Sequence, residues 1–373
     1  MIETSWDEYW WSRVTGPREV VSSAISALRS RKSVVLLVPR DLPWRHELRR
    51  SVRSDLESIP ELEDLIVDTV DIEDEGASDV DPGKILLDRY ALKGDRTGYR
   101  EGSRESIQDY LLKKRVISNK LVWIKGIGAN CSQKWVDFCE HWKPRNIADG
   151  IFVIEVREQP QIARSRHAEL IRYEERVSEY DAQLFNSLVI GDDEMSRLNA
   201  SWKRYAASVT THLCGTDAEV AQSFMDQHRF KEDNPIETLR EIAESDLFNK
   251  RGSGAHVLAV YRDGNMTELN KRIWAGQVEV LFPLIERQRL EIVDKYRLQF
   301  ETEIGRGLKQ FDADVEKPED IELGTMVYMI ASKRLDIPDH SERQKIHVLR
   351  DCRNRLAHRD VCDLERVKAL LEA

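Results

Sequence analysis

Four short apolar runs, separated by stretches with helical spacing, constrain the fold of the N-terminal half of this chain. Each run is rich in valine, leucine and isoleucine and is bounded by polar or turn-forming residues. Such runs are typical of strands buried on both faces, as in a parallel sheet covered by helices. We therefore predict an α/β domain with strands at residues 33–38, 65–70, 120–125 and 150–156 and helices at 18–29, 44–58, 107–116 and 133–142.

The loop after the first predicted strand decides which chemistry this domain can support. A phosphate-binding loop at this place needs glycines for close backbone approach, a lysine for the phosphates and a serine or threonine for magnesium. Residues 38–45 read Val-Pro-Arg-Asp-Leu-Pro-Trp-Arg and contain none of these, and the two prolines remove backbone N–H donors. The third strand leads into Lys125-Gly126-Ile127-Gly128, without the paired carboxylates that would handle magnesium and water.

The order of elements resembles the core of P-loop ATPases of the AAA+ and STAND type. In those proteins a helix precedes the first strand, and a phosphate-binding loop joins that strand to the next helix. The resemblance implies their fold without their chemistry, because the Walker A residues are missing at 38–45. We expect a degenerate ATPase-like domain that does not hydrolyse ATP and that serves in partner binding or sensing. An unrelated three-layer α/β domain is the alternative.

Helical patterns dominate the rest of the chain. Residues 159–178 are charged and predict a helix that leaves the sheet domain, and short amphipathic helices follow. A segment rich in glycine, serine and charge at 249–254 is the expected domain boundary. A long helix at 266–302, which Pro283 is expected to kink or break, then begins a C-terminal bundle. The predicted domains are an α/β domain at 1–165 and all-α domains at 166–250 and 255–373.

A hexapeptide at the end of a helix predicted at 342–356 carries the clearest chemical signal. It reads Arg353-Asn354-Arg355-Leu356-Ala357-His358. Arginine stabilises an anionic, phosphorane-like state and does not deprotonate, and histidine can move a proton near neutral pH. Together they suffice for RNA cleavage without a metal, in which the ribose 2′-OH attacks the adjacent phosphate.

The hexapeptide resembles the R-x4-6-H signature of the HEPN superfamily, whose commonest form is Arg-Asn-x-x-x-His. HEPN domains are small helical bundles, many of them ribonucleases of toxins and antiviral defence systems, and they usually act as dimers with two motifs facing each other. The resemblance covers at most the final third of the chain. It implies roles for five residues. Arg353 would stabilise the developing negative charge, Asn354 would orient the phosphate or the histidine, and His358 would act as general acid or base. Arg355 and Arg359 would contact phosphates.

Two alternatives compete with a defence- or toxin-type ribonuclease controlled by its ATPase-like domain. In the first, the chain is a non-catalytic scaffold or adaptor subunit of a multi-protein antiphage complex. Arg353 and His358 then cap a helix end, where their positive charges interact favourably with the helix dipole. In the second, the chain binds nucleic acid without cutting it, although a net charge of −10 disfavours nonspecific binding. The expected partners are RNA as substrate, other proteins, and a second copy of the chain or a larger assembly.

Bulk properties favour a cytoplasmic protein. No run approaches the roughly 18 apolar residues that a membrane span needs, and the start, Met1-Ile2-Glu3-Thr4, is acidic where a signal peptide would be basic. The five cysteines form no Cys-x-x-Cys pair, and the nine histidines show no metal-binding spacing. We therefore expect reduced thiols, no membrane contact, no metal and no cofactor.

Overall fold

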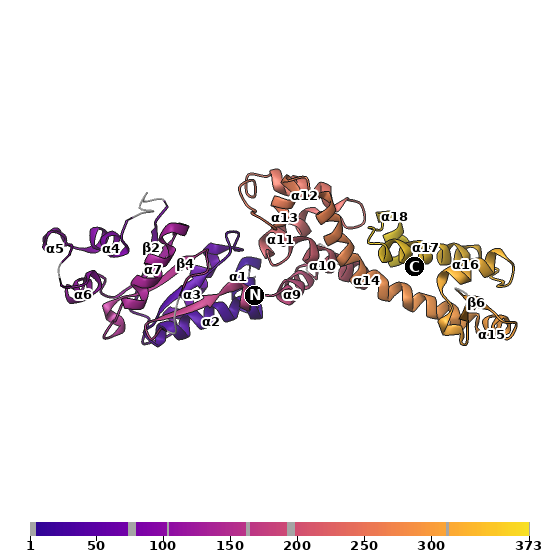
Figure 1. Ribbon diagram of the computed structural model, residues 1–373, viewed down its shortest axis with the longest axis horizontal. Helices are drawn as coiled ribbons and strands as arrows, with labels where there is room; N and C mark the ends of the chain where they lie inside the picture. Colours follow the sequence, from indigo (N-terminus) through magenta and orange to yellow (C-terminus); the bar gives the residue numbers. More distant parts are fainter. Residues whose placement is uncertain are drawn as a thin grey trace. The chain divides into compact units, whose positions relative to one another are not determined.

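The computed structural model describes residues 5–73, 80–102, 104–161, 165–191, 198–310 and 313–372 (Figure 1). The chain divides into two compact units, Met1–Asp181 and Ala182–Ala373. The first unit is α/β, and the described part of the second is helical apart from a two-stranded ribbon. The prediction of an α/β region followed by helical regions is therefore confirmed. The second unit includes most of the range 166–250 and all of the range 255–373, which the sequence suggested as separate domains.

A five-stranded parallel sheet lies at the centre of the first unit. Its order is β2-β3-β4-β1-β5, so β1 lies between β4 and β5. All four predicted strands are present, and their ends lie within one residue of the expected ones. The strands are β1 (Ser33–Leu37), β2 (Ile66–Asp71), β3 (Lys120–Lys125), β4 (Ile151–Val156) and β5 (Ala168–Arg172).

Strand β5 shows that the prediction of a helix over residues 159–178 is wrong. It pairs in parallel with β1, from Ser33↔Ala168 to Leu37↔Arg172. Because β5 is an edge strand with a neighbour on one side, its sequence Ala-Glu-Leu-Ile-Arg needs no continuous apolar run and keeps charges at the surface. The first unit consequently continues past residue 165, the expected boundary, to Asp181.

Helices cover both faces of this sheet. Side chains alternate between the two faces along each strand, and Val35, Val122 and Phe152 share a core with α4, α6 and α7 on one face. Glu155, next to Ile154 of that core, points to the other face and pairs with α3. The helices of this unit are α1 (Trp6–Arg13), α2 (Thr15–Arg29), α3 (Arg45–Glu57), α4 (Pro82–Tyr90), α5 (Lys93–Gly98), α6 (Ile107–Lys113), α7 (Ala129–His141), η1 (Ile147–Asp149) and α8 (Tyr173–Arg176).

The long helix α14 (Met266–Lys295) organises the second unit (Figure 1). It packs against both α10 and α17. Pro283 lies inside α14 and does not break it, and the helix ends at Lys295 instead, with Tyr296 as its C-cap. The other elements are α9 (Glu179–Val189, which begins in the first unit), α10 (Ala200–Cys214), α11 (Ala218–Gln227), α12 (Pro235–Glu244), α13 (Val257–Arg262), α15 (Arg297–Gly305), β6 (Lys309–Gln310), β7 (Ala313–Asp314), η3 (Pro318–Asp320), α16 (Leu323–Ala331), α17 (His340–Ala357) and α18 (Leu364–Leu371).

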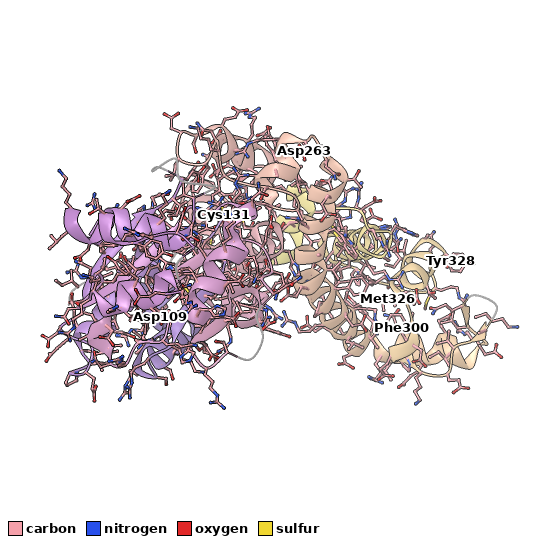
Figure 2. All side chains as sticks on the ribbon, turned by 60° about the vertical axis from the view of Figure 1, so that its left-hand side comes forward. Asp109, Cys131, Asp263, Phe300, Met326 and Tyr328 are labelled. Carbon is pink, nitrogen blue, oxygen red and sulfur yellow. The ribbon has the colours of Figure 1, made fainter. Side chains whose placement is uncertain are left out.

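The surface of the second unit carries a few isolated apolar side chains. Figure 2 shows Phe300, Met326 and Tyr328 in the region of α15 and α16, where Phe300 and Met326 are buried and Tyr328 is exposed. Single exposed apolar residues of this kind are normal on a folded protein. Across the described ranges, no helix combines the length and the apolar composition that crossing a membrane would require.

Helices α10 and α14 approach each other closely at Gly276. A Cβ at this position would lie 2.7 Å from Cα and 3.0 Å from the backbone N of Val209. The buried Ser208 hydroxyl donates to the Gly276 carbonyl at 3.1 Å, which joins the two helices at the same point. Because the neighbouring atoms are backbone, a side chain here can be accommodated only if the helices move apart.

We expect Gly276→Ala to lower the free energy of unfolding of the second unit by about 1–3 kcal/mol, because the methyl group overpacks against Val209. This loss outweighs the roughly 1 kcal/mol by which alanine is the better helix former. Gly324→Ala in α16 is the matched control, because its Cβ would meet no atom within 4 Å. Urea unfolding followed by circular dichroism should show stabilisation of Gly324→Ala alone, and equal gains from both substitutions would contradict the close contact.

Candidate functional site

The predicted motif lies on the last turn of α17 and on the residues after it. Asp339 caps the start of this helix by accepting a hydrogen bond from the Ser341 N–H at 2.8 Å. One face of α17 is buried against α14 and α16 through Ile346, Leu349, Cys352 and Leu356. The motif residues are therefore distributed around a helix whose orientation is set by its apolar face.

Arg353 lies beside the buried face and has an acidic neighbour. Its Nη2 is 3.6 Å from Oε2 of Glu322, and both side chains are 41% exposed. The charge of Arg353 also acts on Glu286 of α14, whose pKa is held below its usual range mainly by hydrogen bonds from Arg289 and to a lesser extent by Arg353. A half-exposed ion pair of this kind contributes about 0–1 kcal/mol. A phosphate group could therefore displace Glu322 from Arg353.

Asn354 and His358 occupy a different side of α17. Both are exposed, and they are four positions apart, which places them on one side of the helix. Arg353 and His358 are five positions apart, and a helix turns about 100° per residue, so their directions differ by about 140°. Within the described residues, no hydrogen bond joins Arg353 to His358. One copy of α17 therefore does not bring the arginine and the histidine together.

His358 and Arg359 also form the C-terminal cap of α17. The Asp360 N–H donates to the Arg355 carbonyl at 2.9 Å, and the Arg359 N–H donates to the Leu356 carbonyl at 3.2 Å. These two bonds form a Schellman motif, with Arg359 at its left-handed position, φ 64°. Glycine is the usual residue there because it has no Cβ. For Arg359, an L-residue with a side chain, the left-handed conformation is unfavourable in free energy.

Two residues of α14 that the sequence analysis did not single out hold the motif segment in place. The indole N–H of Trp274 donates to the Leu356 carbonyl at 2.7 Å. The side chain of Gln277, which is buried, accepts from the Cys362 N–H at 2.8 Å and donates to the Cys362 carbonyl at 2.9 Å. From the sequence, the spacing of Trp274 and Gln277 on α14 indicates only core residues. Their role could not be predicted, because the residues that they bind lie more than eighty positions away in the chain.

In the first unit, an arginine occupies the place where a phosphate-binding loop would operate. Nη2 of Arg45, at the start of α3, donates to the carbonyls of Pro39 (3.2 Å) and Arg40 (3.1 Å). Its Nη1 lies 3.2 Å from Oε2 of Glu155, a buried carboxylate on β4. Glu155 also accepts from the Trp123 indole at 2.6 Å. The loop therefore turns carbonyl oxygens toward an internal cation, whereas phosphate binding requires N–H groups directed at the ligand.

The carboxyl ends of β1, β4 and β5 border a cavity of about 400 Å³. Arg157 and Arg172 contribute positive charge to its wall, and Glu174 and Glu175 contribute negative charge. Arg172 is already engaged by Gln159 at 3.3 Å and by Glu175 at 3.5 Å. The cavity thus has mixed charge and no geometry that selects one ligand. Among the residues that the structure describes, no three His, Cys, Asp or Glu side chains gather as a metal site would require.

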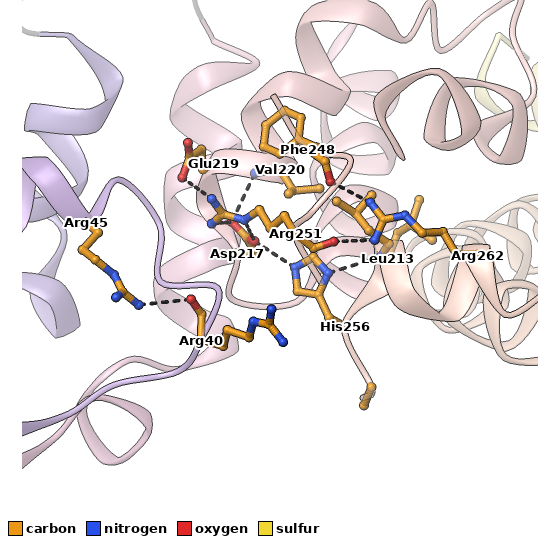
Figure 3. Close-up of polar contacts among 12 residues, drawn as sticks. Arg40, Arg45, Leu213, Asp217, Glu219, Val220, Phe248, Arg251, His256 and Arg262 are labelled. Carbon is orange, nitrogen blue, oxygen red and sulfur yellow. Dashed lines mark hydrogen bonds and ion pairs between the residues drawn. The ribbon is translucent and has the colours of Figure 1, made fainter. Parts of the chain in front are cut away.

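A buried ionic cluster in the second unit links the start of α11 to the start of α13. Figure 3 shows Asp217 between Arg251, which donates from Nε and Nη2 at 2.8 Å each, and His256, whose Nε2 lies 2.8 Å away. Nδ1 of His256 accepts from the Leu258 N–H at 3.2 Å, so the ring proton belongs on Nε2. Arg251 also binds Glu219 at 2.6 Å. Because structural partners engage each of these groups, we interpret the cluster as a support of the fold.

No protein-family model matches this chain, and a search of curated proteins finds no significant match. Function is therefore argued below from the residues and their geometry.

Removing the charge of Asp217 should destabilise the second unit in a pH-dependent manner. Burial alone would raise the pKa of Asp217, but the hydrogen bond from His256 and the charge of Arg251 outweigh burial and hold it below its usual range. A depressed folded-state pKa contributes stability above the unfolded value of about 4, and that contribution disappears as the pH falls through the folded value. At pH 7 we expect Asp217→Asn to cost about 3–5 kcal/mol, because Arg251 loses its buried partner.

Urea unfolding of Asp217→Asn and of the wild type at several pH values measures this effect. The difference between the two proteins should be full at neutral pH and should shrink as the pH falls below about 4. Asp246→Asn, at an exposed position, is the control and should leave stability unchanged. A difference that is independent of pH would show that the ionised carboxylate is not the stabilising group.

Arg359→Gly should stabilise the second unit by about 0.5–1 kcal/mol, because glycine adopts φ 64° without the Cβ penalty. Arg355→Gly, four residues earlier and inside α17, should instead destabilise it by about 1 kcal/mol. Thermal unfolding of both variants checks the opposite signs. A loss of stability in Arg359→Gly would mean that the arginine side chain makes a contribution larger than its backbone cost.

Proposed function

We propose that the second unit is a HEPN-like, metal-independent endoribonuclease and that the protein is of the defence or toxin type. The observation that carries this proposal is the exposed end of α17, where Asn354, His358 and Arg359 face solvent and Arg353 pairs weakly with the half-exposed Glu322. A buried or fully paired motif would be unable to meet RNA. Here the groups needed for phosphate binding and proton transfer are within reach of a ligand.

The chemistry follows from the residue types. His358 takes the proton from the ribose 2′-OH, whose oxygen then attacks the adjacent phosphorus. The guanidinium of Arg353 stabilises the charge that develops on the phosphate oxygens. Asn354 orients the phosphate or the imidazole, and Arg355 and Arg359 bind neighbouring phosphates. The leaving 5′-oxygen then receives a proton from the protonated histidine.

The active site needs a second copy of the chain. Because Arg353 and His358 diverge by about 140° around α17, a single copy cannot direct both at one phosphate. In a twofold dimer, the surface around α17 of one copy faces the same surface of the other. Arg353 of one copy then acts with His358 of the second copy, and the dimer contains two equivalent sites.

The first unit serves as a sensor or docking domain that does not hydrolyse ATP. Its loop after β1 is held by Arg45 and the buried Glu155, and it offers carbonyl oxygens where a nucleotide phosphate requires N–H donors. A protein partner that engages this unit would control the nuclease. Cytoplasmic location follows from the same proposal, since the substrate is cellular or viral RNA.

Two observations favour a second candidate, a non-catalytic scaffold or adaptor in a multi-protein antiphage complex. Glu322 already neutralises Arg353, and His358 with Arg359 completes a helix cap. In this case the motif stabilises the bundle, and the surface of α17 binds protein. The two candidates predict different effects of replacing His358 on RNA cleavage.

His358→Ala should abolish cleavage of a mixed RNA pool in the presence of EDTA, because it removes the only group assigned to proton transfer. A loss of at least about 10²-fold is expected for a general acid or base. His347→Ala, an exposed histidine on the same helix, is the matched control and should cleave as the wild type does. Equal cleavage by wild type and His358→Ala would refute the assignment, and no cleavage by the wild type would favour the scaffold.

A mixing experiment tests the composite site. Arg353→Ala and His358→Ala should each be inactive alone, but half of the dimers in an equimolar mixture contain both variants. Each mixed dimer has one intact site out of two, so the mixture should recover about a quarter of wild-type activity under twofold symmetry. No recovery from two folded, dimeric variants would place Arg353 and His358 of one copy in the same site.

A further inference from the structure

Two buried thiols stand on either side of the motif. Cys352 precedes Arg353 on α17 and is fully buried, and Cys362 follows the helix cap and is 2% exposed. They are ten positions apart, and Cys362 Sγ lies 3.9 Å from the Cys352 carbonyl oxygen. Their side chains also form a hydrogen bond with each other. The cap of α17 therefore folds the chain back so that the Cys362 side chain lies against Cys352.

The backbone on both sides of this contact is held by α14. Gln277 binds the N–H and the carbonyl of Cys362, and Trp274 binds the Leu356 carbonyl. Cys362 consequently has little freedom to move away from α17. Such fixed thiols can form a bond with small movements, because a disulfide requires specific Cα and Cβ separations that the backbone must already approach.

The two thiols differ in reactivity. The hydrogen bond from Cys352 lowers the pKa of the Cys362 thiol, and the same bond raises the pKa of Cys352. Cys362 is therefore the better nucleophile, since the thiolate is the reactive form. Cys362 also lines a cavity of about 270 Å³ together with Tyr205, His228 and Asp363, which gives a small oxidant a place beside this residue.

We propose that Cys352 and Cys362 are a reversible disulfide site whose ring encloses residues 353–361, including the entire motif. The oxidant is a peroxide. Cys362 thiolate attacks one peroxide oxygen, the O–O bond breaks, and hydroxide leaves and takes up a proton to become water, so that Cys362 becomes a sulfenic acid. Cys352, losing its proton, attacks the sulfenic sulfur, the S–O bond breaks and a second water leaves. Two thiols are oxidised by two electrons, and one peroxide is reduced to two waters.

The bond would restrain the segment that carries Asn354, His358 and Arg359. A disulfide here ties the end of α17 to the segment held by Gln277, so the cap can no longer open independently of α14. This inference holds whether or not the chain cleaves RNA, because it rests on the two thiols and their supports. A disulfide in a reducing compartment is transient, and a dithiol reductant should reverse it.

The test is peptide mapping of the full-length protein after hydrogen peroxide and after dithiothreitol. Trypsin cleaves after Arg353, Arg355 and Arg359, so the peptides of Cys352 and Cys362 stay together only if a disulfide joins them. We expect the joined peptide, with two hydrogens fewer than the sum of the separate ones, in oxidised wild type and in the control Cys214→Ser. It should be absent from Cys352→Ser and from all reduced samples. Oxidised wild type should also melt several degrees higher than reduced wild type.

Two results would overturn the proposal. In the first, peroxide leaves both peptides of the wild type separate, with free thiols. In the second, Cys362 of the wild type accumulates as sulfinic acid as readily as it does in Cys352→Ser, which would show that Cys352 does not capture the sulfenic acid. Both readouts are independent of ribonuclease activity.

Discussion

The close contact between α14 and α10 at Gly276 sets the geometry of the second unit. Only a residue without a Cβ lets the backbone of Val209 approach to this distance, and the Ser208 hydroxyl then reaches the Gly276 carbonyl. Trp274 and Gln277, on either side of Gly276, hold the end of α17 and the segment after it. The position of the motif, and of the two thiols around it, therefore depends on how α14 lies against α10.

In the loops, arginine side chains hold the backbone in place by donating hydrogen bonds to its carbonyl groups. Arg45 binds two loop carbonyls and the buried Glu155 in the first unit. Arg262 in the second unit donates to the carbonyls of Ala243, Phe248 and Arg251, beside the Asp217 cluster (Figure 3). An arginine that satisfies several backbone carbonyls removes the cost of burying them unpaired. In the loop after β1, the same arrangement directs carbonyl oxygens toward Arg45, whereas a phosphate would need N–H groups.

The candidate site illustrates what a local motif can and cannot predict. The residue types of Arg353, Asn354 and His358 and their place at a helix end were evident from the sequence, and α17 ends at Ala357, one residue after the predicted end. Their directions were not evident, because these depend on which face of α17 is buried. Glu322, which pairs with Arg353, lies 31 positions earlier and gave no signal. Whether the motif cleaves RNA remains the prediction that His358→Ala tests.

The α/β character of the first unit, its four central strands and the helical character of the second unit could be predicted from the amino-acid sequence. These follow from local apolar periodicity, which backbone geometry converts directly into strands and helices. Three features became visible only in the folded chain: β5 joins the sheet, Arg45 binds the loop after β1, and Cys362 lies against Cys352. Each of these features depends on which surfaces pack together. The residues in contact are far apart in the sequence, and no local periodic pattern predicts such pairs.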